Sequence, residues 1–285
     1  MSLDSAGRRA VAWVAALVAL ASSAPAWAQP SPKLRPDPGV TAYEYTMIES
    51  LQGQPERGFR VDFDLISGAD QSLVAAIKAV WTDQAGAWTP TAFDPACVTA
   101  LHGQTGELAR VTLNPLPADA ADMGASFMAT CAPDPLFLSM TDILNVALVQ
   151  VSPKFGADKL RAVGDSAPSD AFQSSIDRPS VSVKAASPGG RTELTALAAD
   201  TATVDWVPDL MQLTLVERNN PAQGPITLAG TEHFSFRLLI DPRTGVLQSA
   251  SAPYDDLAVV VQMPGLDPKY APHLAIKRAV TIVRR

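Results

Sequence analysis

Hydrophobic and polar residues alternate with a period of two along much of the chain, which is typical of half-buried β-strands. Between residues 59 and 65 the apolar side chains share one face, and Asp62 and Asp64 share the other. A polar turn at residues 52–58 separates this strand from a second apolar-polar segment at 43–48. The two segments are therefore predicted to form a hairpin.

Similar strand candidates, separated by turn signals, continue to the end of the chain. They cover residues 73–82, 98–102, 107–113, 181–185, 193–198, 203–206, 211–218, 234–240, 246–250, 257–263 and 275–283. In the turn at 241–245, Pro242 suits a type I turn and Gly245 can adopt a positive φ. Repeated hairpins of this kind predict an antiparallel sheet.

The period changes to that of a helix at about residues 135–152. Asp134 is a favoured N-cap and Pro135 suits the first helical position. Apolar residues then recur at three- and four-residue spacings until Pro153 and Gly156. The stripe predicts buried positions at Phe137, Met140, Leu144, Leu148 and Val151, with Asp142 and Asn145 facing outward.

These elements predict an α+β fold that is predominantly β. We expect an extended, curved antiparallel sheet or incomplete barrel, with the helix at about 135–152 packed on its concave side. Residues 29–39 form a proline-rich extended lead-in and residues 40–285 one β-rich domain, with 166–180 as the place where a subdivision would fall. This architecture is similar in outline to periplasmic carriers of lipoproteins and other apolar ligands. The resemblance implies an incomplete barrel that shelters acyl chains.

Residues 1–28 have the features of a secretory signal peptide. Arg8 and Arg9 precede an apolar run at residues 10–21, and small residues occupy the two positions that signal peptidase reads in Ala26-Trp27-Ala28. We therefore expect export to the periplasm or the extracellular medium, and a mature protein that begins at Gln29.

Cys97 and Cys131 are the only cysteines of the chain. Two cysteines in an exported protein favour one structural disulfide. A redox role is disfavoured because there is no Cys-x-x-Cys motif and neither cysteine has a neighbouring His or Lys to lower its pKa.

Composition excludes several classes of partner. The formal net charge is -7, which disfavours nucleic acid and anionic lipid surfaces, since both require a basic surface. No stretch after the signal peptide has the roughly 18 apolar residues of a membrane helix. The mature protein is therefore expected to be soluble.

Sequence patterns predict no catalytic, cofactor-binding or metal-binding residues. Gly164-Asp165-Ser166 has the residues of a hydrolase nucleophile block, but hairpins follow it, and Asp267 and His273 are not spaced as its partners. It is interpreted as a turn. His102, His233 and His273 lack metal-ligand spacing.

Two carboxylate pairs have the residue types of an acid and a base group, but their positions favour a solvent-exposed role. Asp62 and Asp64 are expected on a solvated strand face. Asp255 and Asp256 are expected in an acidic surface loop.

The leading hypothesis is an exported, soluble, non-enzymatic cell-envelope protein that binds an apolar ligand or an envelope partner. It requires no cofactor. One alternative is an exported serine hydrolase whose site is assembled from distant residues such as Ser166, Asp267 and His273. Another is a purely structural envelope protein. The first hypothesis predicts an apolar cavity between the helix and the sheet.

Overall fold

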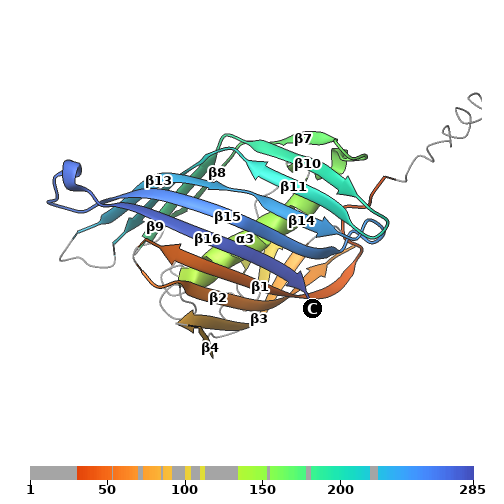
Figure 1. Ribbon diagram of the computed structural model, residues 1–285, viewed down its shortest axis with the longest axis horizontal. Helices are drawn as coiled ribbons and strands as arrows, with labels where there is room; N and C mark the ends of the chain where they lie inside the picture. Colours follow the sequence, from red (N-terminus) through yellow and green to blue (C-terminus); the bar gives the residue numbers. More distant parts are fainter. Residues whose placement is uncertain are drawn as a thin grey trace, which may run out of the picture. The chain divides into compact units, whose positions relative to one another are not determined.

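The computed structural model describes residues 31–285, except for 53, 70–72, 85, 92–99, 104–109, 113–133, 153–154, 178–180 and 219–223. The signal peptide, Cys97 and Cys131 lie outside the described residues, so signal-peptide cleavage and the disulfide stay predictions. In the described part, sixteen strands form one antiparallel sheet (Figure 1). They are β1 (Gly39–Leu51), β2 (Arg57–Ser67), β3 (Leu73–Gln84), β4 (Ala87–Pro90), β5 (Ala100–Gly103), β6 (Arg110–Thr112), β7 (Ser166–Ser169), β8 (Phe172–Asp177), β9 (Val181–Ser187), β10 (Gly190–Leu197), β11 (Ala202–Pro208), β12 (Met211–Glu217), β13 (Ile226–Phe234), β14 (Phe236–Ile240), β15 (Leu247–Gln262) and β16 (His273–Arg284).

The main path of the sheet runs β6-β5-β3-β2-β1-β16-β15-β13-β12-β9-β8 and does not close among the described strands. Strand β15 is long enough to pair with two strands along one edge. Its first part pairs with β14, which leads to β11, β10 and β7, and its second part pairs with β13. The predicted fold class, a predominantly β protein with an open antiparallel sheet and one main helix, is confirmed.

The predicted hairpin is formed by β1 and β2, in which Tyr43 lies opposite Phe63. Phe59, Val61, Phe63 and Leu65 of β2 are buried on the inner face of the sheet. Asp62 and Asp64 lie on the other face, as predicted, where Asp62 is 3.3 Å from Arg285 and Asp64 is 2.9 Å from Lys78. These two carboxylates are partners of surface ion pairs.

Several strands differ from the prediction. Residues 166–180, expected as a polar boundary, contain β7 and β8, which pair with β10 and β9. Strand β13 was not predicted. The segments 246–250 and 257–263 belong to the single strand β15, whose register shifts between Ala252 and Asp255. The bulge lets the strand continue past Pro253, so Asp255 and Asp256 lie in a strand rather than in a loop.

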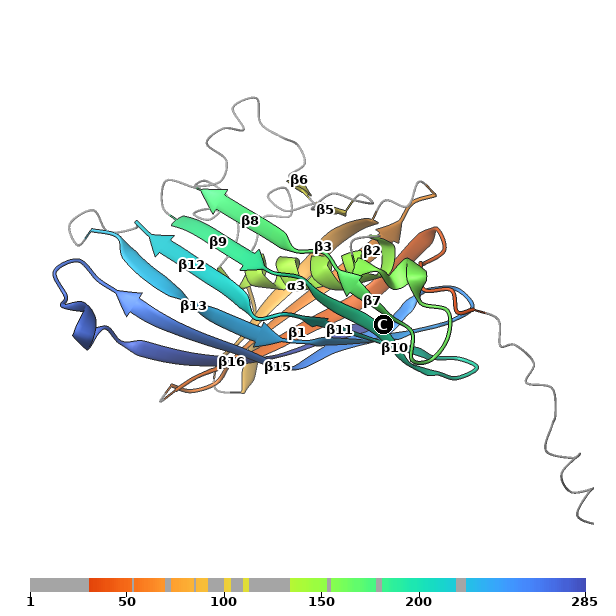
Figure 2. The same cartoon turned by 90° about the horizontal axis from the view of Figure 1, so that it is seen from above.

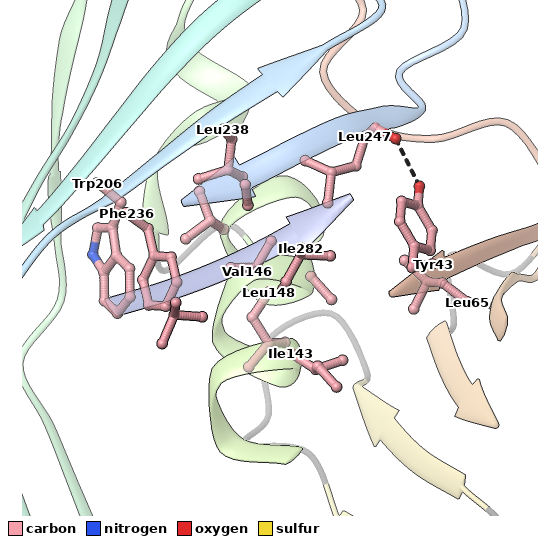
Figure 3. Close-up of a cluster of buried hydrophobic side chains, with 14 of the residues drawn as sticks. Tyr43, Leu65, Ile143, Val146, Leu148, Trp206, Phe236, Leu238, Leu247 and Ile282 are labelled. Carbon is pink, nitrogen blue, oxygen red and sulfur yellow. Dashed lines mark hydrogen bonds between the residues drawn. The ribbon is translucent and has the colours of Figure 1, made fainter. Parts of the chain in front are cut away.

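The helix α3 (Asp134–Val151) agrees with the predicted bounds and lies along the concave side of the sheet (Figures 1 and 2). Its residues Ile143, Val146 and Leu148 belong to one hydrophobic cluster that includes side chains of β1, β2, β11, β14, β15 and β16 (Figure 3). Leu148 and Val151 are buried as predicted, whereas the side chains of Phe137, Met140 and Leu144 lie outside the described residues, so their burial stays a prediction. Among the described residues no helix is both long and apolar enough to cross a membrane.

One prediction for the helix is wrong, because Asp142 is buried and only 7% exposed. Asn145 is half-buried. The curved sheet surrounds α3 on more than one side, as the buried Val146, Ala147, Leu148 and Val149 at successive positions show. A helix in this position has no solvated face at residue 142, and a polar side chain there requires partners from the sheet.

The lead-in before β1 is held against the turn between β14 and β15. The backbone N–H groups of Lys33 and Asp37 donate to the carbonyl oxygens of Pro242 and Thr244, both at 2.9 Å. Gly245 has φ +71°, as the turn prediction requires. A Cβ at this glycine would lie 1.8 Å from the carbonyl oxygen of Arg35, so only glycine permits the close approach.

The side chain of Gln150 joins three segments at this end of the molecule. Its Nε2 atom donates to the carbonyl oxygens of Leu34 and Gly245, each at 3.0 Å. The last turn of α3 is thereby fixed to the lead-in and to the β14–β15 turn by a buried amide.

Candidate functional site

Burial changes along the inner face of β16. Val280 and Ile282 are fully buried in the cluster that contains α3. Arg278 comes two residues before Val280 and is also buried. Nearer to the start of the strand, Ile276 and Leu274 are only half-buried. Alternate residues of a strand share a face, so all five side chains point to the same side of the sheet.

The half-buried inner surface continues from β16 across β15, β13, β12 and β9. We call this surface the open half. Figure 2 shows β8, β9, β12 and β13 fanning out on one side of the sheet. The strand registers place the inward side chains of β9, β12, β13, β15 and β16 next to one another. The half-buried apolar residues of the open half are Ala185, Leu213, Leu215, Ile226, Leu228, Leu257, Val261, Leu274 and Ile276, whereas Val259 on the same face is buried.

A cluster of charged side chains lies at the border between the packed core and the open half. Arg278 is directly opposite Asp255 of β15, and its Nη2 atom forms an ion pair with that carboxylate. The same nitrogen is 2.8 Å from Oε1 of Glu232 in β13. The Nη1 atom is 4.0 Å from Oδ2 of Asp142 in α3, which also accepts a hydrogen bond of 2.7 Å from the hydroxyl of Tyr45 in β1. We call these five residues the charge cluster.

The charge cluster connects four strands to the helix from the inside of the fold. Four of its five members are deeply buried, among them Arg278 at 8% and Asp255 at 3% exposed. Glu232 is the member that belongs to a half-buried strand, since β13 is buried at Phe234 and half-buried from Glu232 back to Ile226. Glu232 is thus the carboxylate that continues into the open half.

Burial and charge shift the pKa values of the cluster strongly. Burial raises the pKa of Asp142 to about 6, although Arg278 opposes the shift. Burial also raises the pKa of Asp255 to about 7, and the adjacent Glu232 carboxylate raises it further against the attraction of Arg278. Burial by itself lowers the pKa of Arg278, but its three carboxylate neighbours raise it above its ordinary value.

Three buried atoms of the cluster have no hydrogen-bond partner: Nε and Nη1 of Arg278 and Oδ1 of Asp255. Unsatisfied buried polar atoms are uncommon and costly in folded proteins. The cluster is therefore an arrangement of opposite charges in which hydrogen-bonding capacity is left over.

Sequence patterns do not predict this cluster, although the sequence contains one signal of it. Along β16 the inward positions 274, 276, 280 and 282 are apolar, and Arg278 is a charged residue in the same register. A charged residue on the apolar face of a strand requires a partner when that face is buried. Its partners come from strands and a helix that are distant in sequence, so only the fold identifies them.

The residues considered for a hydrolase are not brought together. Ser166 begins β7 and pairs with Glu193 of β10. Asp267 and His273 belong to the hairpin between β15 and β16, whose tip lies at the opposite end of the sheet from β7 (Figure 1). The turn interpretation holds for Gly164 and Asp165, whose carboxylate accepts hydrogen bonds from the backbone of Arg161 and Ala162 at 2.7 and 2.8 Å, but Ser166 enters strand β7 rather than a loop.

The histidines show no convergence in the part of the chain that is described. His233 is exposed beside Tyr254, with ring centroids 5.3 Å apart, and His273 is exposed at the start of β16. No group of three or more His, Cys, Asp or Glu residues suited to a metal ion occurs among the described residues.

Comparison with known proteins gives distant similarities of fold. No protein-family model matches the chain, and neither does any curated protein. Among solved structures, the chain is similar to lipovitellin, studied for its lipid–protein interactions, with 11% identity and a TM-score of 0.41 over 87% of this chain and 25% of that chain. This chain therefore spans about a quarter of the lipovitellin chain that it matches.

Two structures from Nitrosomonas europaea are also similar. A putative AttH shares 9% identity over 91% of this chain and 97% of that chain, with a TM-score of 0.20. A LolA superfamily protein shares 9% identity over 89% of this chain and 90% of that chain, with a TM-score of 0.16.

Proposed function

We propose that this protein is an exported, non-enzymatic protein of the cell envelope that binds an apolar ligand on the open half of its sheet. The observation that carries the proposal is the change of burial across the charge cluster. On one side, α3 and the sheet form a packed core; on the other, nine inward apolar side chains among the described residues are only half-buried.

The open half has the chemistry of a contact surface for hydrocarbon. Its apolar side chains are Leu, Ile, Val and Ala from five adjacent strands of one sheet face, on which Glu217 and Glu232 also lie. Burial of apolar surface contributes roughly 25 cal/mol per Å². An alkyl chain lying across several of these leucines would thus gain several kcal/mol, before the entropic cost of binding.

The hydrolase alternative receives no comparable support from the described residues. Ser166 and His273 lie on separate strands that share no pairing, and the open half presents hydrocarbon rather than a nucleophile. An envelope protein partner would use the same apolar surface, and the experiment below separates it from a small ligand.

The test is a fluorescence titration of the purified protein with Nile red, a neutral apolar dye. Replacement of the inward Leu215 by Gln should weaken binding, because the polar amide would lie under the ligand. Val216→Gln is the matched control, since Val216 is also half-buried but points to the opposite face of β12. Saturable binding that Leu215→Gln weakens and Val216→Gln does not supports the proposal. No saturable binding by the wild-type protein contradicts it and favours a protein partner.

A further inference from the structure

We propose that the ligand is an amphiphile with a cationic head group, an ammonium that lies against Glu232 and Asp255 while its alkyl chain covers the open half. This inference rests on the proposed function and specifies its ligand class. It assigns to the charge cluster a role in recognition in addition to its role in the fold.

The first argument is the balance of charge. Three carboxylates, from Asp142, Glu232 and Asp255, surround the single guanidinium of Arg278. When all are ionised, the cluster has two negative charges in excess in a buried environment, where such an excess is costly. A cation reduces the excess, whereas an anion increases it.

The second argument is the unpartnered Oδ1 atom of Asp255. This residue is only 3% exposed, and it lies on the inner face of β15 opposite Arg278, which pairs with its other carboxylate oxygen. An ammonium has three N–H donors and no acceptor. It can donate to Glu232, whose side chain is the more exposed of the two carboxylates, and so place a positive charge beside Asp255.

The unpartnered Nε and Nη1 atoms of Arg278 would by themselves attract an anion. An anionic head group would, however, enter a cluster whose carboxylates already exceed the guanidinium. The sign of the total charge therefore favours a cationic head over a fatty-acid carboxylate.

The third argument is the position of the cluster beside the apolar surface. Glu232 lies opposite Leu257 in the pairing of β13 with β15, and Leu257 lies opposite Ile276 of β16. Both apolar residues belong to the open half. A head group at Glu232 would thus continue directly into an alkyl chain on the adjacent strands.

Protons compete with the ammonium for the same carboxylates. The titratable and charged groups that face the site are Asp142 of α3, Tyr45 of β1, Glu232 of β13, Asp255 of β15 and Arg278 of β16. The pKa values of Asp142 and Asp255 are raised to about 6 and about 7. Binding of an ammonium should therefore release protons and strengthen as the pH rises through this range.

The experiment compares three probes of equal chain length, dodecylammonium, dodecanol and laurate, by isothermal titration calorimetry at about pH 5.5 and about pH 8. At the higher pH, dodecylammonium should bind at least about tenfold more tightly than dodecanol, a ratio that one well-placed ion pair can supply. The ratio should fall at the lower pH. Laurate should bind more weakly than dodecanol.

Glu232→Gln should reduce the preference for dodecylammonium over dodecanol while retaining dodecanol binding, which also shows that the variant is folded. Glu44→Gln is the control, because Glu44 lies on the outer face of β1 with Arg60 and Arg285. Equal binding of dodecylammonium and dodecanol, or a preference for laurate, overturns the head-group inference and leaves the proposed function standing. Failure of all three probes to bind contradicts both.

Discussion

At the scale of single residues, Arg278 is a buried arginine at the centre of the charge cluster. It is the cation shared by Asp142, Glu232 and Asp255, and it is 8% exposed. Loss of one partner from a buried ion pair leaves the other charge buried without compensation. The resulting loss of stability is larger than the net stability that the intact pair contributes. A substitution here should therefore affect folding itself.

The Arg278→Gln variant should lower the free energy of unfolding by about 3–5 kcal/mol, because three buried carboxylates lose their cation. Urea denaturation followed by circular dichroism measures the change. The adjacent Lys277→Gln is the control, since Lys277 is exposed on the outer face of β16 and should alter stability by less than about 0.5 kcal/mol. Similar values for the two variants would show that the charge cluster is not needed for stability.

The pKa of Asp142 predicts a dependence of stability on pH. Burial raises this pKa from 3.8 to about 6, so the folded protein binds a proton more readily than the unfolded chain does. The resulting stabilisation is present below about pH 4 and is lost as the pH rises through about 6.

Asp142→Asn should therefore be neutral near pH 4 and raise the free energy of unfolding at about pH 8, by up to about 3 kcal/mol for a shift of about two units. The asparagine oxygen can still accept from the Tyr45 hydroxyl, and Arg278 retains two carboxylates. Urea denaturation across this pH range provides the comparison. A variant that is less stable than the wild type at about pH 8 would mean that the Asp142–Arg278 attraction outweighs the cost of burial.

At the scale of elements, the sequence predicts the bounds of α3 well. It predicts the surroundings of the polar residues of this helix poorly. Asp134, Pro135 and the apolar spacing define the bounds to within one residue at each end. The orientation of Asp142 could not be predicted, because a helical period identifies an apolar stripe but not whether the opposite side faces solvent or a curved sheet.

The strands also differ in how well the sequence predicts them. The hairpin of β1 and β2 has strict alternation and a polar turn, and both are local signals. Strand β8, with the sequence Phe-Gln-Ser-Ser-Ile-Asp, has weak alternation because it forms an edge of the sheet. The continuity of β15 across Pro253 depends on a bulge that its neighbours β14 and β16 support.

Packing of α3 predicts a contrast between two of its own residues. Leu148 is 2% exposed within the core cluster, so Leu148→Ala should cost about 2–5 kcal/mol of unfolding free energy. Asn145 is half-buried, and Asn145→Ala should cost less than about 1 kcal/mol. Thermal and urea denaturation of both variants measure these values. An equal cost would show that the helix is packed on a different side.

At the scale of the whole molecule, the topology joins residues that no local pattern connects. The charge cluster combines positions 45, 142, 232, 255 and 278, which come from four strands and the helix. The open half likewise needs β9, β12, β13, β15 and β16 in the observed order. The sequence predicts an apolar surface in an open sheet, but the place of that surface follows from long-range strand pairing.

Export is a prediction about the whole chain that rests on residues 1–28. Intact-mass analysis of the protein from the producing cells should give a mature form that begins at Gln29, and a thiol assay of that form should detect no free Cys97 or Cys131. A cytoplasmic form that begins at Met1 would contradict the export part of the proposed function.

The central claim, that an apolar ligand occupies the open half, is tested most directly by photolabelling with a neutral alkyl diazirine. Mass spectrometry of the labelled peptides locates the contact. The expected labels are at Leu213, Leu215, Leu228 and Ile276, on the inner face, and they should disappear when excess dodecanol competes. Labels confined to outer-face residues of the same strands, or labels that dodecanol does not displace, would contradict the claim.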